Sequence, residues 1–480
     1  MTRKFGRLGL CMIGTIAWQG CFAPVKYSGE IKTQEVSISY GDLALSGEVR
    51  NRWWEAFGDA SMNEFIEIVL RENPTLQTAY LKLLDSMYAV KQAQAGYYPT
   101  LGFSAGVGGG GNIYTDPSAD PNYNLGLSLG YEVDLWGKVR AQTRVAELSR
   151  ENASDDAETA AISLVATVVT HWFTVQYYRD RKALTEQLLA ISNDYYELVE
   201  TYYTSGQTTG MDVLEQRQQI ETLRSTLHEL DANIRISVHA LEILAGGKAT
   251  PRITGALPEA IDVGGTLAPD VLLENRPDVR SALRQAQSAD ARIVIALANR
   301  LPSLRLSAAL NYRNSSIVDL FKTLLWDVGA SFAATLFDGF NQTTEIDRAK
   351  ITYLTQRLAY GSTVLEAVAD VEKSLLDLQI AEQNLTDAKA QLERQTEILQ
   401  VSREYFIGGS IDYNRVLSAL RSMVSASQSE LDARRQLLTA QIALFKSMGG
   451  ASWTRELQES GLKKAREMLD SLDDADATAE

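Results

Sequence analysis

Two long segments of the chain carry apolar residues at helical spacing and contain almost nothing that would interrupt a helix. Residues 139–205 include neither Gly nor Pro, and at 1.5 Å per residue they would form a helix on the order of 100 Å long. Its last third has apolar residues at alternating steps of four and three, namely Leu184, Leu188, Ile191, Tyr195, Leu198 and Tyr202. This seven-residue repeat predicts packing against another long helix, as in a coiled coil.

The partner helix is predicted to follow directly. After the Gly206–Gly210 turn, residues 211–245 again lack Pro and interior Gly. Their apolar stripe comprises Ile220, Leu223, Leu227, Leu230 and Ile234. Because the turn between the two helices is short, they should run antiparallel, forming a helical hairpin over residues 138–245.

The chain repeats itself with a period of 203 residues. Asn73-Pro74 corresponds to Arg276-Pro277, Gly206 to Gly409, and Val213-Leu214 to Val416-Leu417. We therefore expect a first repeat over residues 51–245, a Gly- and Pro-rich linker over 246–269 and a second repeat over 270–450. The second repeat should contain its own long hairpin, over residues 341–448.

Each repeat also contains a strand pair, over residues 99–134 and 302–337, in which apolar and polar residues alternate. In the clearest case the apolar face comprises Tyr123, Leu125, Leu127, Leu129, Tyr131 and Val133, and the other face is small and polar. A half-buried strand of a soluble sheet would look the same. Strands of about 9–12 residues with aromatic residues at both ends of the apolar face favour membrane-spanning strands. Residues 108–121 and 314–324 are expected to be loops outside the cell.

Four strands are too few to close a barrel, and an open sheet edge is not tolerated in lipid. The barrel should therefore be shared between copies of the chain. Two copies would give eight strands and a lumen filled by side chains, whereas three would give 12 and a lumen wide enough to conduct. The long helices would be shared in the same way.

The N-terminus has the layout of a secretory signal over residues 1–20. Arg3, Lys4 and Arg7 precede an apolar stretch over residues 8–18, and Gly20 precedes Cys21. Cys21 resembles the lipidated cysteine of a bacterial lipoprotein, so residues 21–50 would be a lipid-anchored segment; plain signal cleavage nearby is the alternative. Beyond the N-terminus no run of 18 apolar residues occurs, and we expect no transmembrane helix.

Charge and composition exclude other classes. The net charge of −15 argues against a nucleic-acid partner, which would require a basic surface. No nucleophile and base, metal-ligand cluster or phosphate loop is apparent, so we expect neither an enzyme nor a metal or other cofactor. Residues 451–480 end in several carboxylates and are expected to be a disordered acidic tail.

These features together resemble the outer membrane factors of the TolC-like family, in particular their efflux-pump lipoproteins (NodT-like). The resemblance spans about residues 50–450. The segments that carry it are 53–59 (WWEAFGD), 73–74 (NP), 97–99 (YYP), 131–140 (YEVDLWGKVR), 276–279 (RPDV), 336–339 (LFDG) and 405–421.

The resemblance implies a mostly helical fold with a β-barrel part. Three copies would share a 12-stranded barrel in the outer membrane and a tube of long helices in the periplasm. It implies an exit duct that a periplasmic adaptor and an inner-membrane transporter open at the helix tips. The adaptor would contact the tip turns, which contain Tyr202, Gly206, Tyr405 and Gly409. By alignment from Gly409, the gate positions that hold an apolar residue, an Asp and an Arg in the family are Asn414, Ser418 and Arg421 here.

Two alternatives are open. One keeps the channel but assigns it secreted protein as cargo, as in type I secretion. The other is a lipid-anchored coiled-coil protein that bridges the envelope layers without conducting, but it would not need a second set of polar-faced strands.

Overall fold

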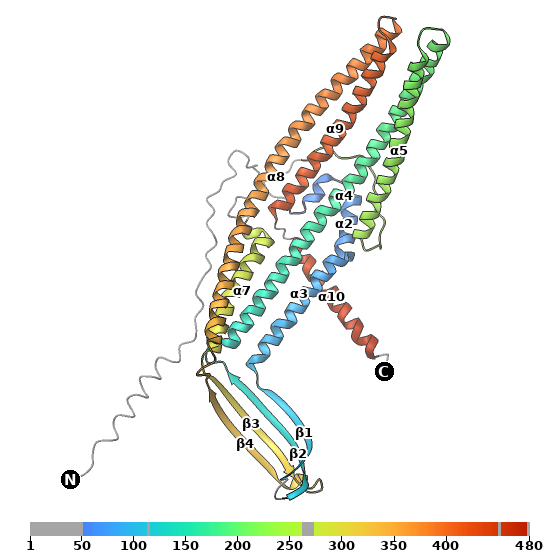
Figure 1. The fold of residues 1–480 in the computed structure, drawn as a ribbon. Helices are drawn as coiled ribbons and strands as arrows, with labels where there is room; N and C mark the ends of the chain where they lie inside the picture. The colour runs from blue at the N-terminus through green and yellow to red at the C-terminus, as the bar shows by residue number, and fades with distance from the viewer. Residues whose placement is uncertain (1–50, 113–115, 262–272, 450–452, 478–480) are drawn as a thin grey trace, which may run out of the picture. The chain divides into compact units, whose positions relative to one another are not determined.

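The computed structural model describes residues 51–112, 116–261, 273–449 and 453–477 (Figure 1). The predicted signal peptide, Cys21 and the rest of the segment up to residue 50 lie outside the described residues. The chain divides into two compact units, each assembled from three separate stretches of sequence. The first unit contains the strands and the adjoining helix ends, and the second contains most of the helical residues.

The first unit is built on one antiparallel sheet in the order β1-β2-β3-β4. The strands are β1 (Thr100–Asn112), β2 (Asp116–Val133), β3 (Ser303–Asn314) and β4 (Leu324–Ala333). The turn η3 (Ala95–Tyr97) precedes β1, and η4 (Leu320–Lys322) lies between β3 and β4.

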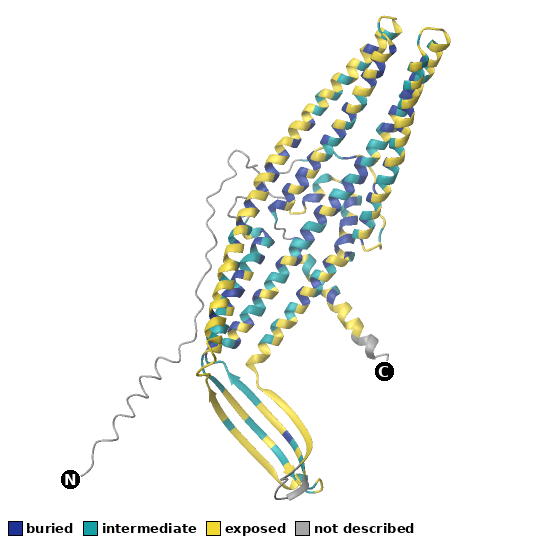
Figure 2. Ribbon diagram, viewed as in Figure 1, coloured by how far each residue is buried: buried dark blue, intermediate teal, exposed yellow. Residues whose placement is uncertain are grey.

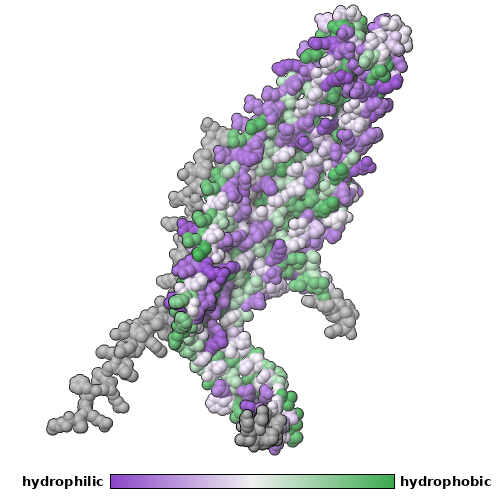
Figure 3. Space-filling model, in the orientation of Figure 1, coloured by the Kyte–Doolittle hydropathy of each residue, from purple (hydrophilic) through white to green (hydrophobic). Residues whose placement is uncertain are grey.

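The strand register places nearly all large apolar residues on one face of the sheet. One row of paired residues runs Phe103, Leu127, Leu310 and Trp326 across the four strands. The next residue along each strand points to the opposite face, where small and polar residues predominate. Phe103 and Trp326 are 68% and 75% exposed, so the apolar face is uncovered within one chain (Figures 2 and 3).

The predicted loop over residues 108–121 is wrong for most of its length. β1 continues to Asn112 and β2 begins at Asp116, with Gly108 paired to Asn122 and Asn112 to Asp116. Antiparallel pairing uses backbone groups, so a glycine run can extend a hairpin that its side chains would not predict.

Long helices dominate the rest of the chain. The helices of the first half are α2 (Ala60–Glu72), α3 (Pro74–Gln94), α4 (Lys138–Thr204) and α5 (Gly210–Leu244). Those of the second half are α7 (Pro277–Asn299), α8 (Asn341–Ile407), α9 (Tyr413–Met448) and α10 (Trp453–Ala477). α4 and α8 have 67 residues each and begin 203 residues apart, which confirms the predicted repeat.

The apolar stripes predicted on the first hairpin are covered by neighbouring helices. Leu188 and Tyr195 of α4 and Leu223 and Leu230 of α5 are all buried. α4 also contains a stretch long and apolar enough to cross a membrane, but half of it is buried by the chain's own packing. Its apolar character is therefore explained in part by the helical core.

A junction at which helix ends meet occurs in both repeats. The Asn73 side chain caps α3 and donates to the carbonyl oxygen of Leu244 at 2.9 Å. Arg276, its counterpart in the second repeat, donates to the carbonyl oxygen of Ser447 at 2.9 Å. Polar side chains at these positions therefore satisfy orphan carbonyls at the ends of α5 and α9.

The core of the second unit is rich in tryptophan and is closed by the C-terminal helix. The turn η2 (Trp53–Phe57) buries Trp53 against Phe445 and Trp54 against Trp453. Trp172 of α4 donates to Asp59, the residue that caps α2. These contacts join η2 and the cap of α2 to α4, α9 and α10.

The expectation of a disordered tail is wrong for residues 453–477, which form α10. Trp453 and Ala465 are buried, and Gln458 exchanges hydrogen bonds with Ser154 of α4. The carboxylates at its far end dominate the composition and hide this amphipathic pattern.

The described part of the inter-repeat linker is packed against helices of the second unit. Ile253 and Leu257 are buried, Arg179 donates to the carbonyl oxygen of Ile253, and Asp180 accepts the backbone N–H of Leu257 at 2.7 Å. Burial raises the pKa of Asp180 despite that hydrogen bond.

Candidate functional site at the helix tips

The two turns that join α4 to α5 and α8 to α9 have the same backbone geometry. Gly206 and Gly409 adopt φ angles of 76° and 69°, the left-handed conformation that glycine reaches without strain. The N–H of Gln207 binds the carbonyl oxygen of Tyr202 at 2.8 Å, and that of Ser410 binds Tyr405 at 2.9 Å. Both turns are glycine-terminated helix ends whose last carbonyls are satisfied.

Each turn leads into a capped helix. The Thr209 side chain accepts from the N–H of Asp212, and the Asp212 carboxylate accepts from the N–H of Thr209, which together make a capping box. Asp412, the counterpart of Thr209, caps α9 by accepting from the N–H of Arg415 at 3.1 Å. Burial opposes the ionisation of Asp212, but hydrogen bonds from Thr208, Thr209 and Asn414 outweigh it and lower its pKa.

An apolar cluster behind the turns packs the two hairpins together. Tyr195 and Val199 of α4 are buried with Tyr413, Val416, Leu417 and Leu420 of α9. Aromatic rings continue the contact. The ring centroid of Phe406 lies 5.3 Å from that of Tyr202 and 5.9 Å from that of Tyr413, both in edge-to-face geometry. Such pairs contribute about 0.5–1.5 kcal/mol each beyond the area they bury.

A buried polar relay crosses this cluster. The Tyr413 hydroxyl donates to Gln216 of α5 at 2.7 Å, and the Gln216 amide donates to the carbonyl oxygen of Ser192 of α4 at 2.6 Å. Gln216 is fully buried, and burial raises the pKa of Tyr413. The relay therefore joins three helices with neutral groups that are satisfied only in this arrangement.

The three predicted gate residues lie on one exposed stripe of α9, opposite the face that carries Val416 and Leu420. Asn414, Ser418 and Arg421 are spaced by four and three residues and are all exposed. Among the described residues, Arg421 has no ion-pair partner. The stripe therefore presents the unpaired Arg421 cation and the Ser418 hydroxyl outside the chain's own core, whereas Asn414 also hydrogen-bonds Asp212 of α5.

The predicted tip-turn residues divide between packing and exposure. Tyr202 packs on Phe406, whereas Tyr405 is exposed, as are Gly206 and Gly409. Further large apolar side chains are exposed beside the turns, namely Tyr203, Met211, Leu214 and Ile407. The turns thus present an apolar surface that the chain itself does not cover.

Sequence reasoning misses the relay and most of the aromatic cluster. It places Tyr195 and Tyr202 correctly on the coiled-coil stripe, but nothing in that stripe identifies Tyr413, Phe406 or Gln216 as their partners. The useful signal is Tyr413 directly after the capping residue Asp412, at a position where a first-turn residue is usually polar.

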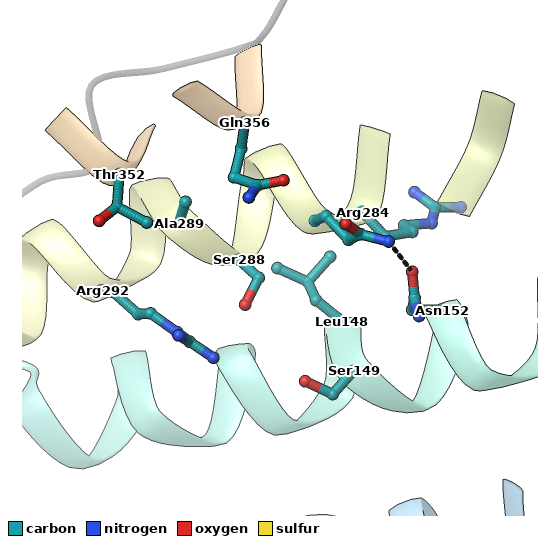
Figure 4. Close-up of a pocket in the computed structure, with 10 residues that line it drawn as sticks. Leu148, Ser149, Asn152, Arg284, Ser288, Ala289, Arg292, Thr352 and Gln356 are labelled. Carbon is teal, nitrogen blue, oxygen red and sulfur yellow. Dashed lines mark hydrogen bonds between the residues drawn. The ribbon is translucent and has the colours of Figure 1, made fainter. Parts of the chain in front are cut away.

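A polar cavity of about 250 Å³ in the first unit is the main alternative site (Figure 4). It lies between Ser149 and Asn152 of α4, Arg284 and Ser288 of α7 and Gln356 of α8. Some of its charged and amide groups are already paired, since Arg284 lies 2.8 Å from Glu151 and Gln285 donates to Asn152 at 3.2 Å. Within the described residues, no group of His, Cys, Asp or Glu could hold a metal ion.

Comparison with known proteins gives the same architecture. The family described as "Outer membrane efflux protein" matches residues 65–247 and again 268–450, two ranges that begin 203 residues apart. The probable outer membrane lipoprotein SilC of Salmonella typhimurium is 26% identical over 428 residues, covering 87% of this chain and 92% of SilC. The pyoverdine export outer membrane protein OpmQ of Pseudomonas aeruginosa is 25% identical over 421 residues, covering 85% of this chain and 88% of OpmQ.

Solved structures share the fold. A crystal structure of CusC superimposes with a TM-score of 0.81 at 20% identity and covers 88% of this chain and 99% of that one. The tandem repeat, the four-stranded sheet and the two long hairpins are thus features of a known architecture, and the match of both repeats shows that the chain belongs to the outer membrane efflux protein family.

Proposed function

We propose that three copies of the chain form the outer-membrane exit duct of a tripartite efflux pump, closed at rest at the helix tips. The observation that carries this proposal is the sheet. It has a continuous apolar face, and within the described residues β1 and β4 have no partner on their outer edges. A sheet in lipid must close, and 12 strands from three copies would enclose an aqueous lumen.

The long helices support the same assembly. α8 exposes an apolar stripe with spacing of three, four and seven residues, comprising Ile351, Leu354, Leu358 and Leu365. This is the spacing of a coiled-coil stripe, and in a single chain it faces water. Neighbouring copies would cover it when the helices close into a tube.

The tips support a gate. Ser418 and Arg421 are free of the chain's own core, so three such pairs could meet around the symmetry axis, with Asn414 held beside them by Asp212 of α5. Arg421 would then bind acceptors of a neighbouring copy, because no carboxylate of its own chain pairs with it among the described residues. A periplasmic adaptor would dock on the exposed apolar side chains beside the turns, and an inner-membrane transporter would bind the adaptor.

The family places the protein in the outer membrane, and we propose that lipidation of Cys21 anchors the segment before residue 51. The chain would add no enzymatic chemistry and no cofactor. OpmQ is described as a pyoverdine exporter and CusC as a cation efflux protein, which supports small molecules or ions as the cargo of this chain.

Planar-bilayer recording tests the gate. The wild-type trimer should give small currents, whereas Arg421→Glu should place like charges at the tips and give larger ones. Arg415→Glu is the matched control, since Arg415 is also exposed on α9 but lies about 120° away around the helix. Equal conductance in the wild type and Arg421→Glu would show that Arg421 does not close the duct.

A further inference from the structure

The polar face of the sheet carries four charged side chains among the residues whose side chains are described. Glu132 lies on β2, Arg305 and Arg313 on β3, and Asp327 on β4. The apolar face carries none, so every described charge of the strands would face the lumen of a closed barrel.

Two of these charges have partners of opposite charge, since Glu132 lies 3.4 Å from Arg305 and 3.7 Å from Lys138. Arg313 donates to the neutral amide oxygen of Asn122 at 3.1 Å and keeps its charge. Asp327 is exposed and, among the described residues, has neither an ion pair nor a side-chain hydrogen bond.

The residues level with Asp327 are small. The register pairs Asp327 with Ala309, Ala309 with Ser128, and Ser128 with Gly102. None of these side chains can neutralise the carboxylate or fill the lumen beside it. Asp327 is therefore an uncompensated charge in a row of otherwise small side chains.

The arginines on β3 are too far away to cancel it. Arg305 and Arg313 each lie four residues from Ala309 along the strand, which is about 13 Å. The screening length is about 8 Å at physiological ionic strength, so each charged row acts locally. A 12-stranded barrel has a radius of about 12 Å. The distance from the barrel wall to its axis is therefore comparable with the screening length.

We propose that Asp327 forms an acidic ring in the barrel lumen that favours cationic over anionic cargo. The inference rests on the proposed trimer, because threefold symmetry puts three copies of Asp327 at the same height. It assigns the preference to the barrel, apart from any selectivity at the helix tips. Anionic cargo would pass this row more slowly than neutral or cationic cargo of the same size.

Thiol labelling tests the local charge without depending on whether the tips are open. Ser128→Cys puts a reporter in the same row, and two thiosulfonate reagents of similar size, one cationic and one anionic, are added from the extracellular side. Labelling is quantified at residue 128 by peptide mass. With Asp327 present the cationic reagent should react faster. Asp327→Asn should lower the ratio of the two rates by about threefold at about 0.15 M salt and by less at about 1 M salt.

Asp319→Asn is the matched control. It makes the same chemical change in the β3–β4 connection, where Asp319 pairs with Lys322 at 2.5 Å, and it should leave the ratio unchanged. A trimer whose ratio is unchanged by Asp327→Asn overturns the assignment of Asp327 alone. A protein that is not trimeric or never conducts overturns the duct itself, and the acidic ring with it.

Discussion

Glu72 shows how single ionisable residues hold the second unit together. It accepts hydrogen bonds from Lys248, at the start of the linker, and from Lys464 of α10, at 2.6 and 3.1 Å. These bonds lower its pKa from 4.5 to about 2. A depressed pKa means that the stabilisation is present above pH 4.5 and is lost as the pH falls toward 2.

Glu72→Gln should therefore lower the melting temperature at pH 7 by about 2 °C, with the difference from wild type shrinking below about pH 4.5. Differential scanning calorimetry from about pH 3 to 7 measures this. Glu67→Gln is the control, because Glu67 is exposed and its ion pairing is with Arg52 on the surface. A pH-independent difference for Glu72→Gln would mean that lost packing, not lost charge, causes it.

The relay at the tip makes a second prediction at this scale. Tyr413→Phe leaves the buried acceptor of Gln216 without a donor, which should cost about 1–3 kcal/mol of local stability. Adding Gln216→Leu should restore part of that loss, because both polar partners are then gone. Hydrogen exchange of the tip peptides reports the local stability. The idea fails if the tip of the double variant exchanges as fast as that of Tyr413→Phe alone, or faster.

At the scale of elements, glycine conformation determines where the hairpins turn. Gly409 has φ 69°, so Gly409→Ala should destabilise the α8–α9 turn by about 1–2 kcal/mol. Gly408 lies next to it without a positive φ, and a Cβ there would meet nothing nearer than 3.5 Å. Gly408→Ala should thus be close to neutral. Thermal unfolding of the two variants side by side checks the difference, and equal losses would contradict it.

The elements that sequence can predict are those with strong periodicity and clear ends. The hairpin helices are predictable to within about a residue because Gly206, Gly409 and Asp412 mark their ends. The strand pairs are also predictable, but the glycines at 108–111 resemble a loop, although they lie in β1. α10 escapes prediction because its carboxylates obscure the stripe from Trp453 to Ala465.

The candidate site is only partly predictable for a different physical reason. Repeat spacing and family alignment place Arg421 and the tip turns on the chain, but contacts between hairpins depend on three-dimensional packing. Tyr195 and Gln216 are both far from Tyr413 in sequence, so no local pattern pairs them. The same holds for Asp327, whose isolation appears only once the register of three neighbouring strands is known.

At the scale of the whole molecule, one chain leaves unsatisfied surfaces of several kinds. Among the described residues the sheet has two open edges and an uncovered apolar face, and α8 has an uncovered apolar stripe. The apolar face of the sheet needs lipid and its open edges need neighbouring strands. The stripe of α8 needs neighbouring helices. The proposed trimer, with three copies around one axis, would satisfy both.

The shared barrel is tested by the mass of the detergent-extracted protein in native mass spectrometry, with the same sample recorded in a planar bilayer. We expect three chains per particle and discrete channel currents. A monomer or dimer that never conducts would contradict this expectation, and the sheet would then have to close in some way other than a shared barrel.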